Sequence, residues 1–289
     1  MSHNIVVLTD FSLAAERARA YAAVLAAPLQ ADLHLVHVYS PTPITTEYGL
    51  VLPVMDPQYA PETQRSLQQV AKSLPVAATA EVLEADWPGA IGEALDKYRP
   101  LLVVAGLTET EGWFSEWFSN RSRPLAAQTG YPLLLVPEHL PDAALRLPQR
   151  LLLAIEDRPF QLEPPAQAVA ALLDVLALDI VAVTVLPPEE NTGGWEGLRA
   201  AQKSGLAACM PRCGLHKVQS ELPASGVLEA VSDLHADVLA LLDQGHGWVH
   251  KLFRGSVIDH VLRHSRVPVL LLAARLPSPE PAPLPNWVI

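Results

Sequence analysis

The sequence predicts an α/β fold made of two tandem, doubly wound parallel domains with five strands each. Three observations support this prediction. Apolar runs of strand length alternate with helical patterns along the chain, the order of these elements is repeated in the second half, and half of the 289 residues are apolar. A repeat on this scale indicates an internal duplication, in which each half has its own core.

The first domain, residues 1–140, begins with a βαβ unit. We expect a strand at Ile5–Thr9, an alanine-rich helix at Leu13–Ala27 and a strand at Leu33–Tyr39, and the apolar strands indicate a sheet covered on both faces. A proline-interrupted loop follows. The alternation then continues with a helix at Pro61–Leu74, a strand at Ala78–Leu83, a helix at Gly89–Tyr98, a strand at Leu101–Ala105, a loop, a helix and a strand at Leu133–Val136.

The second domain, residues 150–276, repeats this order. We expect a strand at Leu151–Ile155, a helix ending at Ala177, a strand at Ile180–Val185, a long connection, a strand at His216–Leu222, a helix from Gly226, a strand at Asp237–Leu242, a loop, a helix and a strand at Pro268–Ala273. The halves align without a gap near their ends, because Gly106 lies 26 residues before Pro132 and Leu242 lies 26 residues before Pro268.

Two segments lie outside the repeated pattern. The stretch Glu138–Gln149 joins the two domains. The tail at residues 277–289 is too rich in proline for a helix or a central strand, so we expect an extended arm.

Composition excludes several classes of protein. The formal net charge of −11 disfavours binding of a nucleic-acid backbone as the main activity. No apolar run is long enough to span a bilayer and the first residues lack a secretory signal, so we expect a cytoplasmic location without membrane contact. Cys209 and Cys213 match neither a common zinc spacing nor a redox pair, and we interpret them as free thiols.

The stretch DQGHGWVHKLFRGSV, Asp243–Val257, collects glycines and cations directly after a strand. In open α/β sheets ligands bind beyond the carboxyl ends of the strands, and a helix N-terminus attracts phosphate. Gly255 and Ser256 are expected to begin the next helix, with Lys251 and Arg254 beside it. The alternative stays open that Gly255-Ser256 only begins a helix and that the glycines only shape a turn.

Other ligand motifs are weaker. The chain has no Gly-Lys pair and therefore no Walker A loop, and in GHGWVH a histidine replaces the third glycine of a dinucleotide fingerprint. His246 with His250, and His260 with His264, have the i, i+4 spacing of helical metal ligands. Neither pair has a third ligand in the sequence, so we expect surface or phosphate-facing histidines and no metal site.

The sequence resembles the universal stress protein (UspA) family in its tandem form. The resemblance rests on NIVVLTDFSLAAERARAYA at Asn4–Ala22, on Gly245 followed after nine residues by Gly255-Ser256-Val257, and on the closing strand after Val267-Pro268. It implies an adenine nucleotide alpha hydrolase-like fold and a role in the stress response. It also implies a pseudo-dimer in which the last strands of the halves, Pro132–Val136 and Pro268–Ala273, pair.

The family's nucleotide loop is Gly, two residues, Gly, nine residues, Gly, then Ser or Thr. The second half has Leu242 in place of the first glycine, and the first half has Gly106 followed by Glu109, Ser119 and Asn120. The family also uses an aspartate after the first strand and a valine late in the second strand, matched by Asp10 and Val38 in the first half. The resemblance thus implies that ATP or a related adenine nucleotide contacts these residues of the second half: Gly245, Gly255, Ser256, Val257, Glu156, Val185, Lys251 and Arg254.

Charge distinguishes the two loops. The first-half loop carries Glu109, Glu111 and Glu116 against Arg121, and carboxylates repel phosphates. We therefore expect one nucleotide, in the second half, or none. The alternative is a nucleotide-free scaffold that acts through a protein partner, and a further homodimer also stays open. Enzymatic activity is left undecided, because no nucleophile and base pair stands out and no catalytic residue is named.

Overall fold

The computed structural model describes residues 3–39, 42–45, 51–54, 58–108, 123–206, 214–243 and 257–277. The described elements of the first half are β1 (His3–Leu8), α1 (Leu13–Leu29), β2 (Ala31–Tyr39), β3 (Thr42–Thr45), β4 (Val51–Val54), α2 (Tyr59–Ser73), β5 (Ala78–Glu84), α3 (Trp87–Tyr98), β6 (Leu102–Leu107), α5 (Arg123–Thr129) and β7 (Leu133–Pro137). A short 3-10 helix, η2 (Asp142–Ala144), lies in the connection between the halves.

The described elements of the second half are β8 (Arg150–Ala154), β9 (Gln161–Leu162), α6 (Pro164–Gln167), α7 (Val169–Leu176), β10 (Asp179–Leu186), α8 (Trp195–Lys203), β11 (Leu215–Gln219), α9 (Pro223–Asp233), β12 (Val238–Asp243), α10 (Val257–His264) and β13 (Val269–Arg275). Among the described helices, none combines the length and the apolarity that crossing a bilayer requires.

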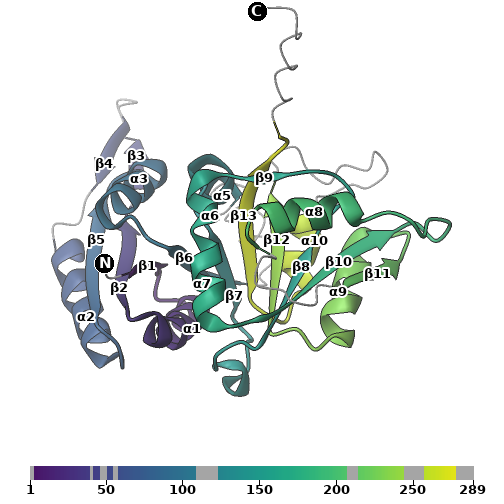
Figure 1. The fold of residues 1–289 in the computed structure, drawn as a ribbon. Helices are drawn as coiled ribbons and strands as arrows, with labels where there is room; N and C mark the ends of the chain where they lie inside the picture. The colour runs from purple at the N-terminus through teal and green to yellow at the C-terminus, as the bar shows by residue number, and fades with distance from the viewer. Residues whose placement is uncertain are drawn as a thin grey trace, which may run out of the picture.

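A single twisted sheet runs through both halves (Figure 1). Its strand order is β11-β10-β8-β12-β13-β7-β6-β1-β2-β5, so each half supplies five strands, and the short β9 pairs with β13 off this path. Along this path pairing is parallel within each half, whereas β13 and β7 pair antiparallel, with Leu270 opposite Leu134. This arrangement confirms the predicted fold class and the predicted pairing of the last strands.

Helices cover both faces of the sheet, as the doubly wound prediction requires. One core cluster joins the strands to α1, α7 and α8, and a second joins the opposite face to α3, α5, α9 and α10. The strands at the centre are buried on both faces, which explains why Leu102–Leu107 and Val238–Asp243 are almost uninterrupted apolar runs.

Three elements differ from the prediction. The long connection after β10 contains the helix α8, whose polar surface and preceding glycines hide its apolar stripe in the sequence. The proline-interrupted loop contains the hairpin β3–β4, in which Pro43 lies opposite Pro53. The helix expected to end at Ala177 is divided into α6 and α7, with the helix boundary at Ala168.

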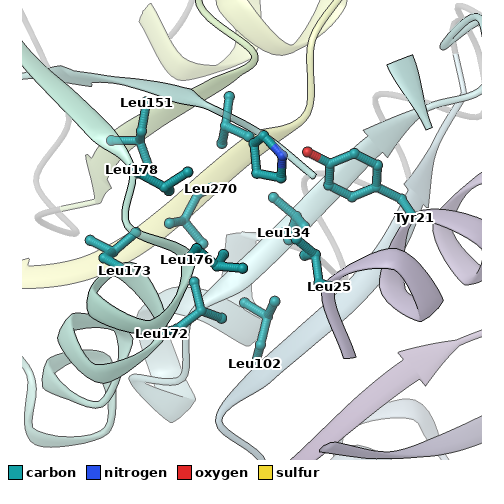
Figure 2. A pocket seen from close by; sticks show the side chains of 12 residues that line it. Tyr21, Leu25, Leu102, Leu134, Leu151, Leu172, Leu173, Leu176, Leu178 and Leu270 are labelled. Atoms are coloured by element: carbon teal, nitrogen blue, oxygen red, sulfur yellow. The ribbon is translucent and has the colours of Figure 1, made fainter. Parts of the chain in front are cut away.

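The two halves are also joined by apolar packing between α1 and α7 (Figure 2). A cavity of about 20 Å³ lies there, and its lining includes Tyr21 and Leu25 of α1, Leu172 and Leu176 of α7, and Leu134 of β7. This volume is close to that of one water molecule and the lining is apolar, so the cavity is a packing gap and not a ligand site.

The connecting segment is tied to both halves by charged contacts. Arg17 of α1 forms an ion pair with Asp142 of η2. Asp237, just before β12, accepts hydrogen bonds from the backbone N–H groups of Gln149 and Arg150 at 2.8 and 3.0 Å, and from Arg146 at 2.9 Å. The segment therefore connects the N-terminal part of α1 with the start of the second half.

Candidate functional site

Backbone hydrogen bonds align the ends of the first two strands in each half. Thr9 N–H donates to Val36 O at 3.0 Å, and Ile155 N–H donates to Val183 O at 2.9 Å. Glu156 therefore occupies the place of Asp10, one residue further along. Val185 likewise occupies the place of Val38, two residues beyond the accepting carbonyl group. The structure thus supports the sequence alignment on which both site assignments depend.

Glu156 lies where the chain leaves β8, beside the beginning of α8. Its carboxylate forms an ion pair with Arg158. Its carbonyl oxygen faces Gly197 so closely that a Cβ atom on Gly197 would lie 2.0 Å away. The next residue, Asp157, accepts a hydrogen bond from the Glu196 N–H at 3.0 Å, which satisfies one of the free donors in the first turn of α8.

Val185 lies near the end of β10 and packs beneath α9. A Cβ atom on Gly226 would lie 2.8 Å from Val185 Cγ1, so this glycine lets the helix approach the valine. Because Val185 is only half-buried, part of its side chain remains accessible at this end of the strand.

The strand β12 ends at Leu242 and Asp243, both of which are buried. Strand pairing makes Leu242 the counterpart of Gly106, because Leu239 pairs with Val269 as Val103 pairs with Leu133. The side chain of Leu242 belongs to the core cluster that includes Leu198 of α8. It therefore points into the protein core and not into an open site beyond the strand.

Five of the predicted ligand-binding residues lie outside the described residues: Gly245, Lys251, Arg254, Gly255 and Ser256. The same holds for His246, His250, Cys209, Cys213, the first-half loop residues Glu109, Glu111, Glu116, Ser119, Asn120 and Arg121, and the tail after Pro277. The helix α10 begins at Val257, which is half-buried, and its apolar face is anchored by Ile258, Val261 and Leu262.

The described part of the second-half site therefore consists of Glu156, Val185, Asp243 and Val257. The first three end neighbouring parallel strands, since β8 lies between β10 and β12. The carboxyl ends of these strands meet at one edge of the sheet, which is where ligands bind in open α/β folds.

Carboxylates dominate the described residues at this edge. Gly193 lies between two of them, since a Cβ atom there would lie 2.8 Å from Glu190 Oε1 and 3.0 Å from Asp157 Oδ2. Asp243 adds a buried carboxylate. The expected cationic surroundings thus depend on Lys251 and Arg254, and the described residues by themselves do not supply them.

The corresponding edge of the first half is occupied by aromatic side chains. Phe11 has a left-handed backbone, with φ of 63°, and its ring lies 5.3 Å from that of His37. The buried His37 ring donates from Nδ1 to Thr9 O at 2.8 Å, and its Nε2 accepts from the Tyr59 hydroxyl group at 3.2 Å. Tyr59 in turn stacks on Tyr39. Sequence analysis missed this cluster, whose only signal is the set of aromatic residues after β1 and β2.

Asp10, the first-half counterpart of Glu156, has a local structural role. Its carboxylate accepts a hydrogen bond from the Ser12 N–H at 3.0 Å, and Ser12 Oγ accepts from the Ala15 N–H at 3.1 Å. Asp10 and Ser12 therefore form the turn and the N-cap that begin α1.

A comparison with models of protein families shows the family to which the chain belongs. A model described as the universal stress protein family matches residues 1–137 and 214–273. The chain belongs to the universal stress protein family. The family model leaves residues 138–213 and 274–289 of this universal stress protein unmatched, and the first of these stretches holds the connecting segment and every element from β8 to α8.

Solved structures share the fold of this universal stress protein at low sequence identity. A universal stress protein from Archaeoglobus fulgidus DSM 4304 is 15% identical, with a TM-score of 0.57, and the alignment covers 93% of this chain and 96% of that one. The cytoplasmic domain of a prokaryotic cation chloride cotransporter is 13% identical, with a TM-score of 0.53 and coverage of 96% of both chains. A search of curated protein sequences gave no match. At these identities the structural likeness shows the fold alone.

Proposed function

We propose that this universal stress protein is a cytoplasmic stress-response module that binds one adenine nucleotide, ATP or a related compound, in its second half. The observation that carries the proposal is the convergence of Glu156, Val185 and Asp243 at the ends of three neighbouring strands, with α10 beginning at Val257 after the glycine loop. This is the edge at which a helix N-terminus and a glycine loop are able to hold a phosphate group.

The leucine at position 242 does not argue against binding. Its side chain is buried and belongs to the same core cluster as Leu198. In the first half the equivalent residue is Gly106. The absence of a side chain there leaves room for the backbone of Ala14 and does not leave an open space. The glycine of the family pattern thus has a packing role in the first half, and in the second half the buried Leu242 stands at the same position.

Because of the carboxylates at this edge, binding of a nucleotide phosphate group requires cationic side chains nearby. Asp157, Glu190 and Asp243 would repel a triphosphate unless cations offset them, and Lys251 and Arg254 are the cations that the sequence supplies nearby. Binding should therefore depend strongly on these two residues, and we expect Mg²⁺ to increase the affinity for ATP.

The first experiment is mass spectrometry of the ligand released from purified, denatured protein. The second is a calorimetric titration of ATP, with and without Mg²⁺, into the parent protein and into the variant Lys251→Glu/Arg254→Glu. A charge-assisted hydrogen bond contributes about 1.5–3 kcal/mol, so the variant should bind roughly a hundredfold or more weakly. Arg121→Glu in the first-half loop is the matched control and should bind like the parent. Equal affinity in all three proteins would contradict the proposal.

The second candidate is a scaffold that carries no nucleotide and binds a protein partner. The contacts of Glu156 favour it, because its carboxylate is paired with Arg158 and its carbonyl group is covered by Gly197. This candidate predicts no released adenine nucleotide and no heat of ATP binding at millimolar concentration. Recovery of a stoichiometric nucleotide from the purified protein would exclude it.

A further inference from the structure

Two histidines lie side by side on the outer face of α10. The side chains of Ile258, Val261 and Leu262 anchor the opposite face in the core, whereas His260 and His264 are exposed. Their rings are stacked, with centroids 4.3 Å apart and planes 27° from parallel. The i, i+4 spacing thus brings both imidazoles together over one helical turn.

A hydrogen bond fixes the tautomer of His264. Its Nδ1 lies 2.8 Å from the carbonyl oxygen of His260, and because a carbonyl oxygen only accepts, Nδ1 must carry the hydrogen. In the neutral ring the lone pair is therefore on Nε2. Histidines that bind metals are commonly held in this way, with one ring nitrogen donating to a backbone carbonyl group and the other facing the ion.

We propose that His260 and His264 form a surface site for a divalent transition-metal ion such as Zn²⁺. Zinc–nitrogen bonds are about 2.0–2.1 Å long and each lone pair lies in the plane of its ring, so both imidazoles must turn out of their stacked arrangement to point at one ion. The two imidazoles supply two ligands and water completes the coordination. Imidazole pairs suit Zn²⁺, Ni²⁺ and Cu²⁺ and not Mg²⁺ or Ca²⁺, which prefer oxygen ligands.

From the sequence alone no metal site is expected at His260 and His264, because no third ligand is convincingly placed. Among the described residues no group of three or more metal-binding side chains occurs, so the described part of the site has two protein ligands. What the sequence could not show is the stacked arrangement of the rings and the hydrogen bond that orients one of them. This proposal is independent of nucleotide binding.

The test is a calorimetric titration of Zn²⁺ into the full chain without an affinity tag, in a buffer that does not bind metals. His260→Ala and His264→Ala should each weaken the binding of Zn²⁺ about tenfold or more. His139→Ala, which removes an exposed histidine outside α10, and His246→Ala/His250→Ala, which removes the other i, i+4 pair, should leave the affinity unchanged.

Two outcomes would overturn the proposal. One is parent-like Zn²⁺ affinity in both His260→Ala and His264→Ala. The other is a loss of affinity confined to His246→Ala/His250→Ala. Circular dichroism checks that each variant is folded. His260→Gln and His264→Gln, which keep a polar side chain of similar size, repeat the measurement if an alanine variant unfolds.

Discussion

A Cβ atom at Gly106 would lie 2.3 Å from the backbone carbonyl carbon of Ala14. The end of β6 is therefore in direct contact with the first turn of α1, and only a residue without a side chain fits between them. In the second half α6 begins ten residues after β8 ends, whereas α1 begins five residues after β1 ends. No helix begins among residues 155–163, all of which the structure describes, and the buried Leu242 stands at the position that corresponds to Gly106.

Replacing Gly106 by alanine should destabilise the protein. The obstructing atoms belong to the backbone, so they cannot move aside cheaply, and we expect a loss of about 3 kcal/mol in the free energy of unfolding. Gly92→Ala is the matched control, because a Cβ atom there has nothing within 4 Å and the position lies inside α3. It should stabilise the protein by about 0.5–1 kcal/mol. Guanidinium unfolding curves measure both, and changes of the same sign would contradict the packing role of Gly106.

The fold could be predicted from the sequence because its signals are local. Apolar runs such as Leu133–Val136 and Pro268–Ala273 are short, buried on both faces and separated by helical patterns, so the ten strands of the main sheet were predicted in their order along the chain, whereas the short strands β3, β4 and β9 were not. The helix α8 was missed because Gly193 and Gly194 precede a largely polar segment. The role of Gly106 was also missed, since contact with Ala14 depends on tertiary structure that no spacing in the sequence reveals.

The candidate site was less predictable than the fold. The alignment of Glu156 with Asp10 was correct because it follows from the ends of buried strands. The ion pair of Glu156 with Arg158 and the capping of α8 by Asp157 could not be foreseen, since α8 itself was not predicted. The roles of Gly255, Ser256, Lys251 and Arg254 stay predictions.

Asp237 should contribute more to stability than Asp179, although both carboxylates contact Arg150. Asp237 accepts from its backbone N–H group, and Asp179 pairs with its side chain. The side chain of Asp237 accepts from two backbone N–H groups and from Arg146, and it is largely buried. Asp237→Ala leaves these donors unpaired and should cost about 2–3 kcal/mol in the free energy of unfolding. Asp179→Ala removes an exposed ion pair with Arg150 and should cost less than about 1 kcal/mol. Thermal and guanidinium unfolding compare the two variants, and an equal loss would disprove the anchoring role.

Stability should fall on mild acidification because of His34. This ring accepts from the Thr79 hydroxyl group at 2.7 Å, donates to Asn4 Oδ1 at 3.1 Å and stacks on Tyr98. Burial lowers its pKa below 6.5, with a smaller opposing effect from Asp32. The unfolded chain therefore binds a proton more readily than the folded one, and stability is lost as the pH falls below 6.5 towards the folded-state pKa.

The measurement is the free energy of unfolding at pH 7.5, 6.5 and 5.5. The parent should lose more stability between pH 7.5 and 5.5 than His34→Gln does. If His34→Gln keeps the full pH dependence, His34 is not its source.

Nucleotide stoichiometry should be one per chain, or zero, and not two. Phe11, His37 and Tyr59 lie together at the first-half edge, and Asp10 is used in the turn that begins α1. Calorimetric titration of ATP into the full chain measures the ratio directly. Two equivalents of bound ATP would show that the aromatic side chains and the glutamates of the first-half loop do not prevent binding.

The antiparallel pairing of β13 with β7 places the joint between the halves at the centre of the sheet. In a dimer of identical subunits every substitution appears twice, so both copies must tolerate it. Covalent fusion of the halves removes that requirement, because the first half always pairs with the second half and never with a copy of itself. The two halves can then carry different residues at equivalent positions, as they do at Gly106 and Leu242 and at Asp10 and Glu156. The central strand pair thus allows one half to specialise while the other preserves the shared core.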